Sequence, residues 1–116
     1  MNYKKKIFHV ENISTEKIAQ KFKTPLYCYS YSKLRNNISV FKKNFKKVNP
    51  LVCFSVKSNS NKKILIEIKK LGLGADVVSK GEMMQALKAG IKANKIVFSG
   101  VGKTYSELEY AINKKI

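Results

Sequence analysis

The sequence predicts an α/β fold built from parallel βαβ units, and two observations carry this prediction. Short apolar runs begin near residues 51, 75 and 95, about 20 to 24 residues apart, and each precedes a segment whose apolar residues have helical spacing. The runs are almost continuously apolar, as strands covered on both faces are. We therefore expect three or four βα units.

The first half of the chain is less regular. Residues 1–13 form an arm with little pattern. Ser14 is a suitable N-cap for a short helix over 16–22, with Glu16 in its first turn. The aromatic run at 26–30 predicts a strand, and apolar residues spaced three and four apart predict a helix over 32–47.

The second half alternates strictly between strand and helix. Glycines follow two of the predicted helices, as is common where helices end. The predicted strands are 51–56, 75–78 and 95–98, and the predicted helices are 61–71, 80–89 and 105–113.

The length of the chain constrains this sheet. A parallel sheet is covered on both faces or closed into a barrel of eight strands, which takes about 250 residues. A chain of 116 residues with three or four units achieves neither. We therefore expect it to be the front part of a larger protein.

The charge of the chain is strongly positive. It has 24 Lys and Arg residues against 7 Asp and Glu, a net charge of +17. All the basic residues except Arg35 are lysines, whereas recognition of bases and phosphates favours the planar fork of arginine. The charge is also spread along the chain, +10 in residues 1–50 and +7 in residues 51–116. We expect solvated helix faces and no specific nucleic-acid partner.

Neither a membrane nor an oxidising compartment is indicated. No run of about 18 apolar residues exists, and the basic start lacks the apolar stretch of a signal peptide. Cys28 and Cys53 lie in apolar runs, so we interpret both as small buried residues without a disulfide. This interpretation places the protein in the cytoplasm.

Lys57 is the strongest candidate for a chemical role. It follows the apolar strand 51–56 directly and precedes a polar loop. In a β/α barrel that position is the rim where active sites are built, and a lysine amine there, partly removed from water, can form a Schiff base with a carbonyl. The alternative is one more solvated lysine in a lysine-rich chain.

Two acidic residues are weaker candidates. Asp76 is the sole aspartate and falls near the end of a predicted strand, where a buried carboxylate held by backbone N–H groups is the alternative. Glu82 follows Ser79 with the spacing of a capping box, and Thr104 and Glu107 repeat that spacing. Both glutamates are therefore suited to a structural role as well.

Two other features give no site. The run Gly100–Lys103 lacks the spacing of a nucleotide-binding phosphate loop. The lone histidine, His9, has no second ligand at useful spacing, so we assign no metal site.

Four segments stand out together in the chain, in the order Thr24–Tyr27, Phe54–Asn61, Gly72–Glu82 and Ile96–Thr104. In this order they resemble the diaminopimelate decarboxylase family. These enzymes depend on pyridoxal phosphate and have an alanine-racemase-like barrel. A serine, Ser58, stands here where the family usually has alanine after the lysine.

The resemblance implies a fold and a set of roles. The chain would be the N-terminal part of a (β/α)8 TIM barrel, with an arm and short helix in residues 1–25 and an incomplete barrel in residues 26–116. Lys57 would attach pyridoxal 5'-phosphate covalently, and Asp76 and Glu82 would line the same rim. The family converts meso-2,6-diaminopimelate to L-lysine and carbon dioxide.

The resemblance also implies what this chain lacks. The family's phosphate-binding loop, the acid that pairs with the pyridine nitrogen and the C-terminal β-domain lie further along the full-length chain. Full-length members form a homodimer whose active site takes residues from both subunits. We therefore expect these 116 residues to be inactive alone.

Other functions remain open at this point. The nearest enzymes are ornithine, arginine and carboxynorspermidine decarboxylases and alanine racemase, which share the fold. Racemases place Gly-His shortly after the lysine, and this chain has Ser58–Asn61 there. A lysine-rich binding module without enzymatic activity is the alternative from another class.

If the lysines reflect composition, binding to mixed-sequence duplex DNA should be weak and should vanish at moderate salt, because only counterion release drives it. Fluorescence anisotropy over a salt series measures this dependence. Sequence preference that survives physiological salt would favour the binding module.

Overall fold

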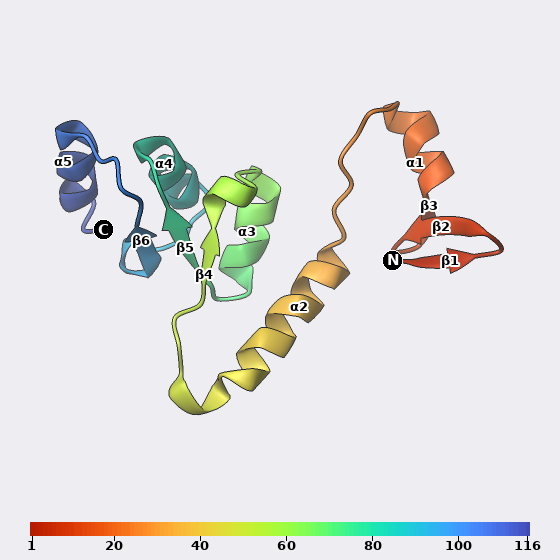
Figure 1. Cartoon of the computed structure of the whole chain (residues 1–116), viewed down its shortest axis with the longest axis horizontal. Helices are drawn as coiled ribbons and strands as arrows, with labels where there is room; N and C mark the ends of the chain where they lie inside the picture. Colours follow the sequence, from red (N-terminus) through yellow and green to blue (C-terminus); the bar gives the residue numbers. More distant parts are fainter. The chain divides into compact units, whose positions relative to one another are not determined.

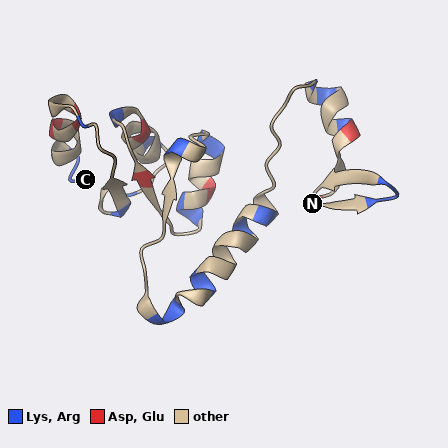
Figure 2. Cartoon of the chain, viewed as in Figure 1, with Lys and Arg blue, Asp and Glu red and all other residues tan.

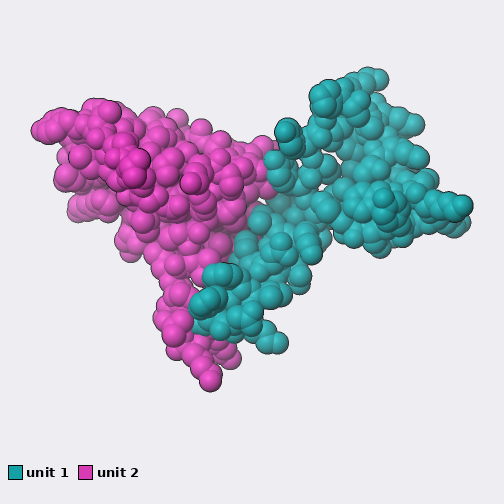
Figure 3. Space-filling view, viewed as in Figure 1, with its two compact units in different colours: residues 1–45 teal, residues 46–116 magenta.

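The computed structural model describes residues 1–116 as two compact units, Met1–Phe45 and Lys46–Ile116 (Figure 3). Figure 1 gives the order of the helices and strands along the chain. Lysine and arginine residues occur on helices of both units and do not gather on one element (Figure 2). None of the helices combines the length and the hydropathy that a bilayer span requires.

The first unit begins with an antiparallel sheet where the sequence had suggested an arm with little pattern. Its strands are β1 (Asn2–Lys4), β2 (Ile7–Val10) and β3 (Ile13–Ser14), in that spatial order. Lys5 and Lys6 join β1 to β2, with φ of 48° and 65°. Two positive φ values in a two-residue loop are typical of the type I′ turn, which matches the twist of the strands it joins.

The short helix α1 (Thr15–Phe22) confirms the prediction for residues 16–22. Ser14 is its N-cap, and the Ser14 hydroxyl accepts a hydrogen bond from the Lys17 N–H at 3.3 Å. Helix α1 contacts β2 and β3, and the Thr15 hydroxyl donates to the Phe8 carbonyl at 3.1 Å. The cap and this contact fix the helix on the small sheet.

The strand predicted for residues 26–30 is not formed. This segment lies between α1 and α2 (Tyr31–Asn44), pairs with no strand, and leaves Tyr27 90% exposed. A strand needs a neighbour to bond its backbone, and a run of aromatic residues alone supplies none. The prediction of a helix from residue 32 is confirmed, although α2 ends at Asn44 and a 3₁₀ turn, η1 (Lys46–Val48), follows.

A carboxylate holds the start of α2. One oxygen of Glu11 accepts hydrogen bonds from the Ser30 hydroxyl and the Ser32 N–H, both at 2.9 Å. These hydrogen bonds, led by the one from Ser32, lower the pKa of Glu11 below its ordinary value. The ionised side chain therefore acts as a second cap on α2, beside Ser30, which accepts from the Lys33 N–H.

The second unit confirms the predicted parallel βαβ arrangement. Its three strands form one parallel sheet in the order β4-β5-β6, and a helix follows each strand (Figure 1). The strands are β4 (Cys53–Ser55), β5 (Gly74–Val77) and β6 (Ile96–Phe98). The helices are α3 (Lys62–Lys70), α4 (Lys80–Lys88) and α5 (Tyr105–Asn113), with 3₁₀ turns η2 (Val56–Ser58) and η3 (Ala93–Lys95).

The core of this unit lies between the sheet and its helices. Fully buried side chains come from β5, η2, α3 and α4, and α4 contacts β5, β6 and α5. The largest are Val56, Leu65, Ile68, Val77 and Met83. Because β5 and β6 both contribute buried residues to this core, the register of these strands is tied to the packing of the helices.

The two cysteines lie in different surroundings. Cys28 is exposed, so the prediction that it is buried is wrong, because the segment that carries it is not part of a sheet. Cys53 is half-buried in β4, and burial raises the pKa of its thiol, with a further contribution from the charge of Asp76. Both thiols are free.

Gly74 lies where its neighbours in the sheet leave no room for a side chain. A Cβ atom at this position would lie 2.2 Å from the Lys95 carbonyl oxygen and 2.8 Å from the Cys53 sulfur. The carbonyl belongs to the backbone and cannot rotate away as a side chain can. Glycine at residue 74 therefore allows β4, β5 and the start of β6 to lie side by side.

Gly74→Ala should lower the free energy of unfolding by about 1–3 kcal/mol, because the added methyl group forces the strands apart. Urea denaturation followed by circular dichroism measures the change. Gly102→Ala is the matched control, since nothing lies within 4 Å of a Cβ at that position. Equal midpoints for the two variants would contradict this account of the sheet.

Candidate functional site

The carboxyl ends of the three parallel strands meet at one edge of the sheet (Figure 1). Ser55, Val77 and Phe98 are the last residues of β4, β5 and β6. The segments that follow them are η2, the turn Val78–Ser79 and the loop Ser99–Thr104. We call this edge with its three segments the rim.

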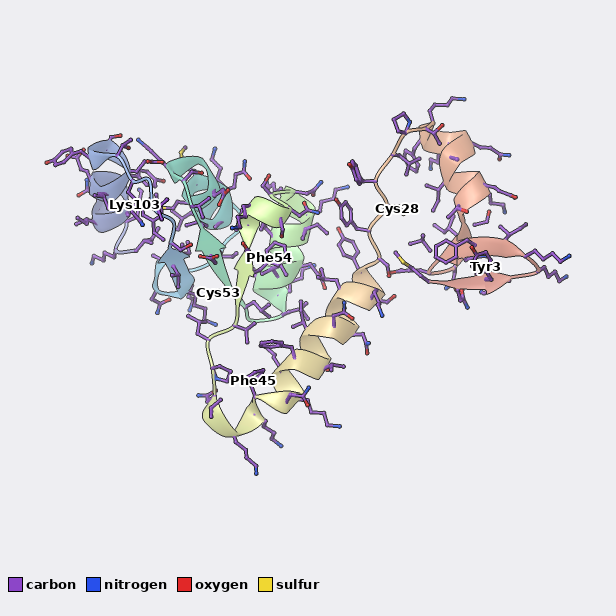
Figure 4. All side chains as sticks on the ribbon, in the orientation of Figure 1. Tyr3, Cys28, Phe45, Cys53, Phe54 and Lys103 are labelled. Atoms are coloured by element: carbon purple, nitrogen blue, oxygen red, sulfur yellow. The ribbon has the colours of Figure 1, made fainter.

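The two faces of the sheet differ in polarity. Neighbours in register share a face, so Phe54, Ala75 and Ile96 lie on one side, the side that the helices bury. Ser55, Asp76 and Val97 form the next row on the opposite side. Cys53 and Phe54, both labelled in Figure 4, are consecutive residues of β4 and so belong to opposite faces of the sheet. The second face therefore presents polar groups near the rim.

Lys57 lies on the rim in η2, two residues after the last residue of β4, close to where the sequence predicted it. Val56 before it is fully buried, whereas Lys57 itself is exposed. The Ser58 hydroxyl donates to the Ser55 carbonyl at 2.7 Å, and the Asn59 N–H donates to the Val56 carbonyl at 3.0 Å. These bonds hold the turn so that the buried valine anchors it and the lysine amine reaches solvent, rather than being partly removed from water as expected.

Asp76 is half-buried in β5, one residue before the end of the strand. The Ser99 hydroxyl donates to one Asp76 carboxylate oxygen at 2.5 Å. The sequence had suggested backbone N–H groups as the alternative partners of this carboxylate, and the structure provides a serine hydroxyl from the adjoining strand's loop. Asp76 therefore joins β5 to the start of the loop Ser99–Thr104.

Glu82 lies in the first turn of α4, where its carboxylate accepts the Val78 N–H at 2.9 Å. The Ser79 hydroxyl accepts the Glu82 N–H at 3.3 Å, as the predicted capping box requires. The second half of that motif differs, because Glu82 reaches back to Val78 instead of Ser79. Glu82 therefore fixes the turn by which β5 enters α4.

Glu107 is a fourth residue at the rim, and its main contact was not predicted. Its carboxylate accepts the Thr104 N–H at 3.1 Å, as the capping spacing indicated. It also accepts the Lys80 N–H at 3.0 Å, across 27 residues of sequence. The hydrogen bond from Lys80, followed by those from Thr104, lowers the pKa of Glu107. Spacing within one helix could not show a contact with another helix.

The loop Ser99–Thr104 folds back on itself. Gly100 has a φ of 94°, a left-handed conformation that favours glycine, and a Cβ there would lie 3.4 Å from the Val78 side chain. The Lys103 amine donates to the Gly100 carbonyl and lies 5.0 Å from the centre of the Phe98 ring. The lysine of the rejected phosphate-loop pattern thus bonds to its own loop.

The structure brings the three predicted site residues to one edge of the sheet. Asp76 and Glu82 are bonded within the rim, to Ser99 and to Val78. Lys57 lies in the adjoining segment, with its side chain exposed. The rim therefore combines one accessible primary amine with two carboxylates that the fold holds in place.

Comparison with protein families identifies the second unit. Residues 31–116 match the model of the pyridoxal-dependent decarboxylase family, pyridoxal binding domain. This match covers all three parallel strands and the rim.

Curated relatives of similar sequence are named diaminopimelate decarboxylase. The protein from Helicobacter pylori J99 is 48% identical over 101 residues, which cover 87% of this chain and 25% of that protein. The protein from Aquifex aeolicus is 39% identical over 116 residues, which cover 100% of this chain and 27% of that protein. The chain therefore spans about a quarter of the length of these relatives.

Solved structures with these names have the same fold. Diaminopimelate decarboxylase from H. pylori complexed with L-lysine has a TM-score of 0.83 at 45% identity, over 88% of this chain and 26% of that one. The M. jannaschii enzyme in complex with L-lysine has a TM-score of 0.94 at 33% identity, over 99% of this chain and 28% of that one. Together with the family match, they show that this chain belongs to the pyridoxal-dependent decarboxylases and carries part of their pyridoxal-binding barrel.

Proposed function

We propose that this chain supplies the cofactor-attaching lysine of a decarboxylase that converts meso-2,6-diaminopimelate to L-lysine and carbon dioxide. The observation that carries the proposal is the position of Lys57, an exposed amine in the turn that follows a parallel strand, at the rim that also holds Asp76. Active sites of β/α barrels are built at this end of the strands.

The donor set of the rim fits pyridoxal 5'-phosphate. Attachment to this cofactor requires a primary amine that an aldehyde can reach, and the exposed Lys57 provides it. When bound, the cofactor supplies an electron sink for the pair of electrons released as the α-carboxylate leaves. The protein has to attach, orient and shield it.

We assign orienting roles to the two carboxylates. Asp76 is held by Ser99, so its second oxygen is available on the polar face of the sheet beside the lysine's segment. Glu82 fixes the turn from β5 into α4 and thereby the backbone of this part of the rim. Lys57, Asp76 and Glu82 would thus form this chain's part of the cofactor site.

The names of the relatives support the choice of substrate. Two of the similar structures are diaminopimelate decarboxylases that hold L-lysine. Lysine is the product of the reaction proposed here. We therefore assign amino acids similar to lysine as the ligands of the complete site.

We further propose that residues 26–116 are the first part of a barrel completed by the rest of a longer protein. The share of the relatives that the chain covers supports this organisation. A homodimer is proposed for the full-length enzyme on the family resemblance. Free thiols at Cys28 and Cys53 support a reducing compartment, the cytoplasm.

Lys57→Ala in the full-length protein should abolish the visible absorption of the covalently attached cofactor. Turnover of meso-2,6-diaminopimelate should fall by about 1,000-fold or more, because attachment and a proton-transferring amine are both lost. Absorption spectra and assays of released carbon dioxide measure the two effects.

Lys62→Ala is the matched control, since Lys62 is an exposed lysine at the start of the following helix. It removes the same charge five residues away and should leave spectrum and turnover unchanged. A Lys57→Ala protein that keeps the absorption band would refute the assignment of Lys57.

A further inference from the structure

The loop Ser99–Thr104 is fixed to the rim at its first residue. The Ser99 N–H donates to the Val77 carbonyl at 2.9 Å, which continues the pairing of β5 with β6. The Ser99 hydroxyl donates to Asp76 at 2.5 Å. The start of the loop therefore cannot move without moving Asp76.

The last residue of the loop is fixed through Glu107. One Glu107 oxygen accepts both the Thr104 N–H at 3.1 Å and the Thr104 hydroxyl at 2.9 Å. The other oxygen accepts the Lys80 N–H at 3.0 Å. A single carboxylate thus connects the first turn of α5 with the first turn of α4.

The backbone of α4 makes this connection specific. The first N–H groups of a helix have no partner within the helix. In α4 the Ser79 hydroxyl accepts the Glu82 N–H, and the Glu82 carboxylate accepts the Val78 N–H. Glu107 accepts the N–H of Lys80, a residue that lies between Val78 and Glu82 in the chain. An ionised carboxylate is the suitable acceptor, because its charge strengthens such bonds and favours a helix N-terminus.

These contacts close a ring around the rim. It runs from Asp76 through Ser99 along the loop to Thr104, and from there through Glu107 to the turn before Glu82. Both carboxylates assigned to the cofactor site lie on this ring. Between α4 and α5 the hydrogen bonds of the ring pass through Glu107. The Lys80 amine also lies 5.1 Å from the centre of the Tyr110 ring, a second contact between the two helices.

We infer that Glu107 is a positioning residue, which holds the Val78–Glu82 turn and the loop Ser99–Thr104 in fixed register and so orients Asp76 and Glu82. The expected effect of Glu107 on the cofactor rests on the proposed function, whereas its expected effect on the backbone does not. Glu107 itself contacts neither Asp76 nor Lys57.

The first test replaces the carboxylate in the full-length protein without cofactor. Glu107→Gln keeps one acceptor oxygen and turns the other into an amide donor, so it cannot serve Lys80 and Thr104 together. Hydrogen–deuterium exchange of peptides covering 78–83 should become about tenfold faster, the change that about 1.4 kcal/mol produces. Glu109→Gln, an exposed glutamate on the same helix, should leave this exchange unchanged.

The second test removes the donor instead. Lys80 is the first residue of α4, where proline is tolerated because its missing N–H has no helical partner. Ser79 before it has φ −151° and ψ 159°, the extended conformation that precedes proline readily. Lys80→Pro therefore deletes the bond to Glu107 within a compatible backbone. Lys80→Ala keeps the N–H and loses the same side chain, so it is the matched control.

Lys80→Pro should also make exchange faster, here in the loop peptides around residues 99–105, and Lys80→Ala should not. With cofactor added, both Glu107→Gln and Lys80→Pro should raise the dissociation constant for pyridoxal 5'-phosphate by about tenfold. The absorption maximum of the bound cofactor should shift, while KM for the amino acid should change less than kcat.

The outcomes separate this inference from the proposed function. Unchanged exchange in Glu107→Gln and Lys80→Pro would overturn the inference. Faster exchange with an unaltered cofactor affinity and spectrum would also overturn it, because Glu107 would then be structural only. A Lys57→Ala protein that keeps the attached cofactor would refute the proposed function. It would leave the hydrogen–deuterium exchange result for Glu107 unaffected.

Discussion

Parallel pairing of β4, β5 and β6 is the constraint on which the candidate site depends. The register that places Ser55 beside Asp76 also brings the ends of all three strands to one edge. Gly74 permits this pairing, because no Cβ fits between Lys95 and Cys53. The helices then bury the opposite face through Ala75 and Val77. Polar residues far apart in the sequence therefore meet at the rim as a consequence of strand direction.

Three of the seven acidic residues in this basic chain accept hydrogen bonds from backbone N–H groups. Glu11, Glu82 and Glu107 each accept such a bond at or next to the start of a helix. A carboxylate near a helix N-terminus satisfies an amide and interacts favourably with the helix dipole. In a chain with 24 basic residues and 7 acidic ones, these three acids are therefore placed by contacts with the backbone.

Sequence patterns predicted the second unit well because its signals are local and repeated. Apolar runs, caps at Ser79 and Thr104 and glycines at helix ends each indicate an element, and the alternation of strand and helix indicates parallel pairing. The position of Lys57 at the end of a strand followed directly. The contact between Glu107 and Lys80 could not be predicted, since it depends on how two helices lie beside each other.

The first unit shows the opposite case. The hairpin turn at Lys5 and Lys6 lacks the asparagine or glycine that usually marks such a turn, so no pattern indicated β1 and β2. The aromatic run 26–30 has strand-like composition but no neighbouring strand, so it remains unpaired. Composition describes the face a strand would bury, and pairing requires a second strand as well.

The most direct test of the central claim locates the covalently attached cofactor. Pyridoxal 5'-phosphate is bound to the full-length protein, and the attached cofactor is reduced with borohydride. The protein is then digested with trypsin, and the peptides are identified by mass spectrometry. Modified Lys57 resists cleavage, so the account predicts a cofactor-bearing peptide that spans residues 48–62. Attachment at another lysine, such as Lys80 or Lys103, would contradict the assignment of Lys57 as the attachment point.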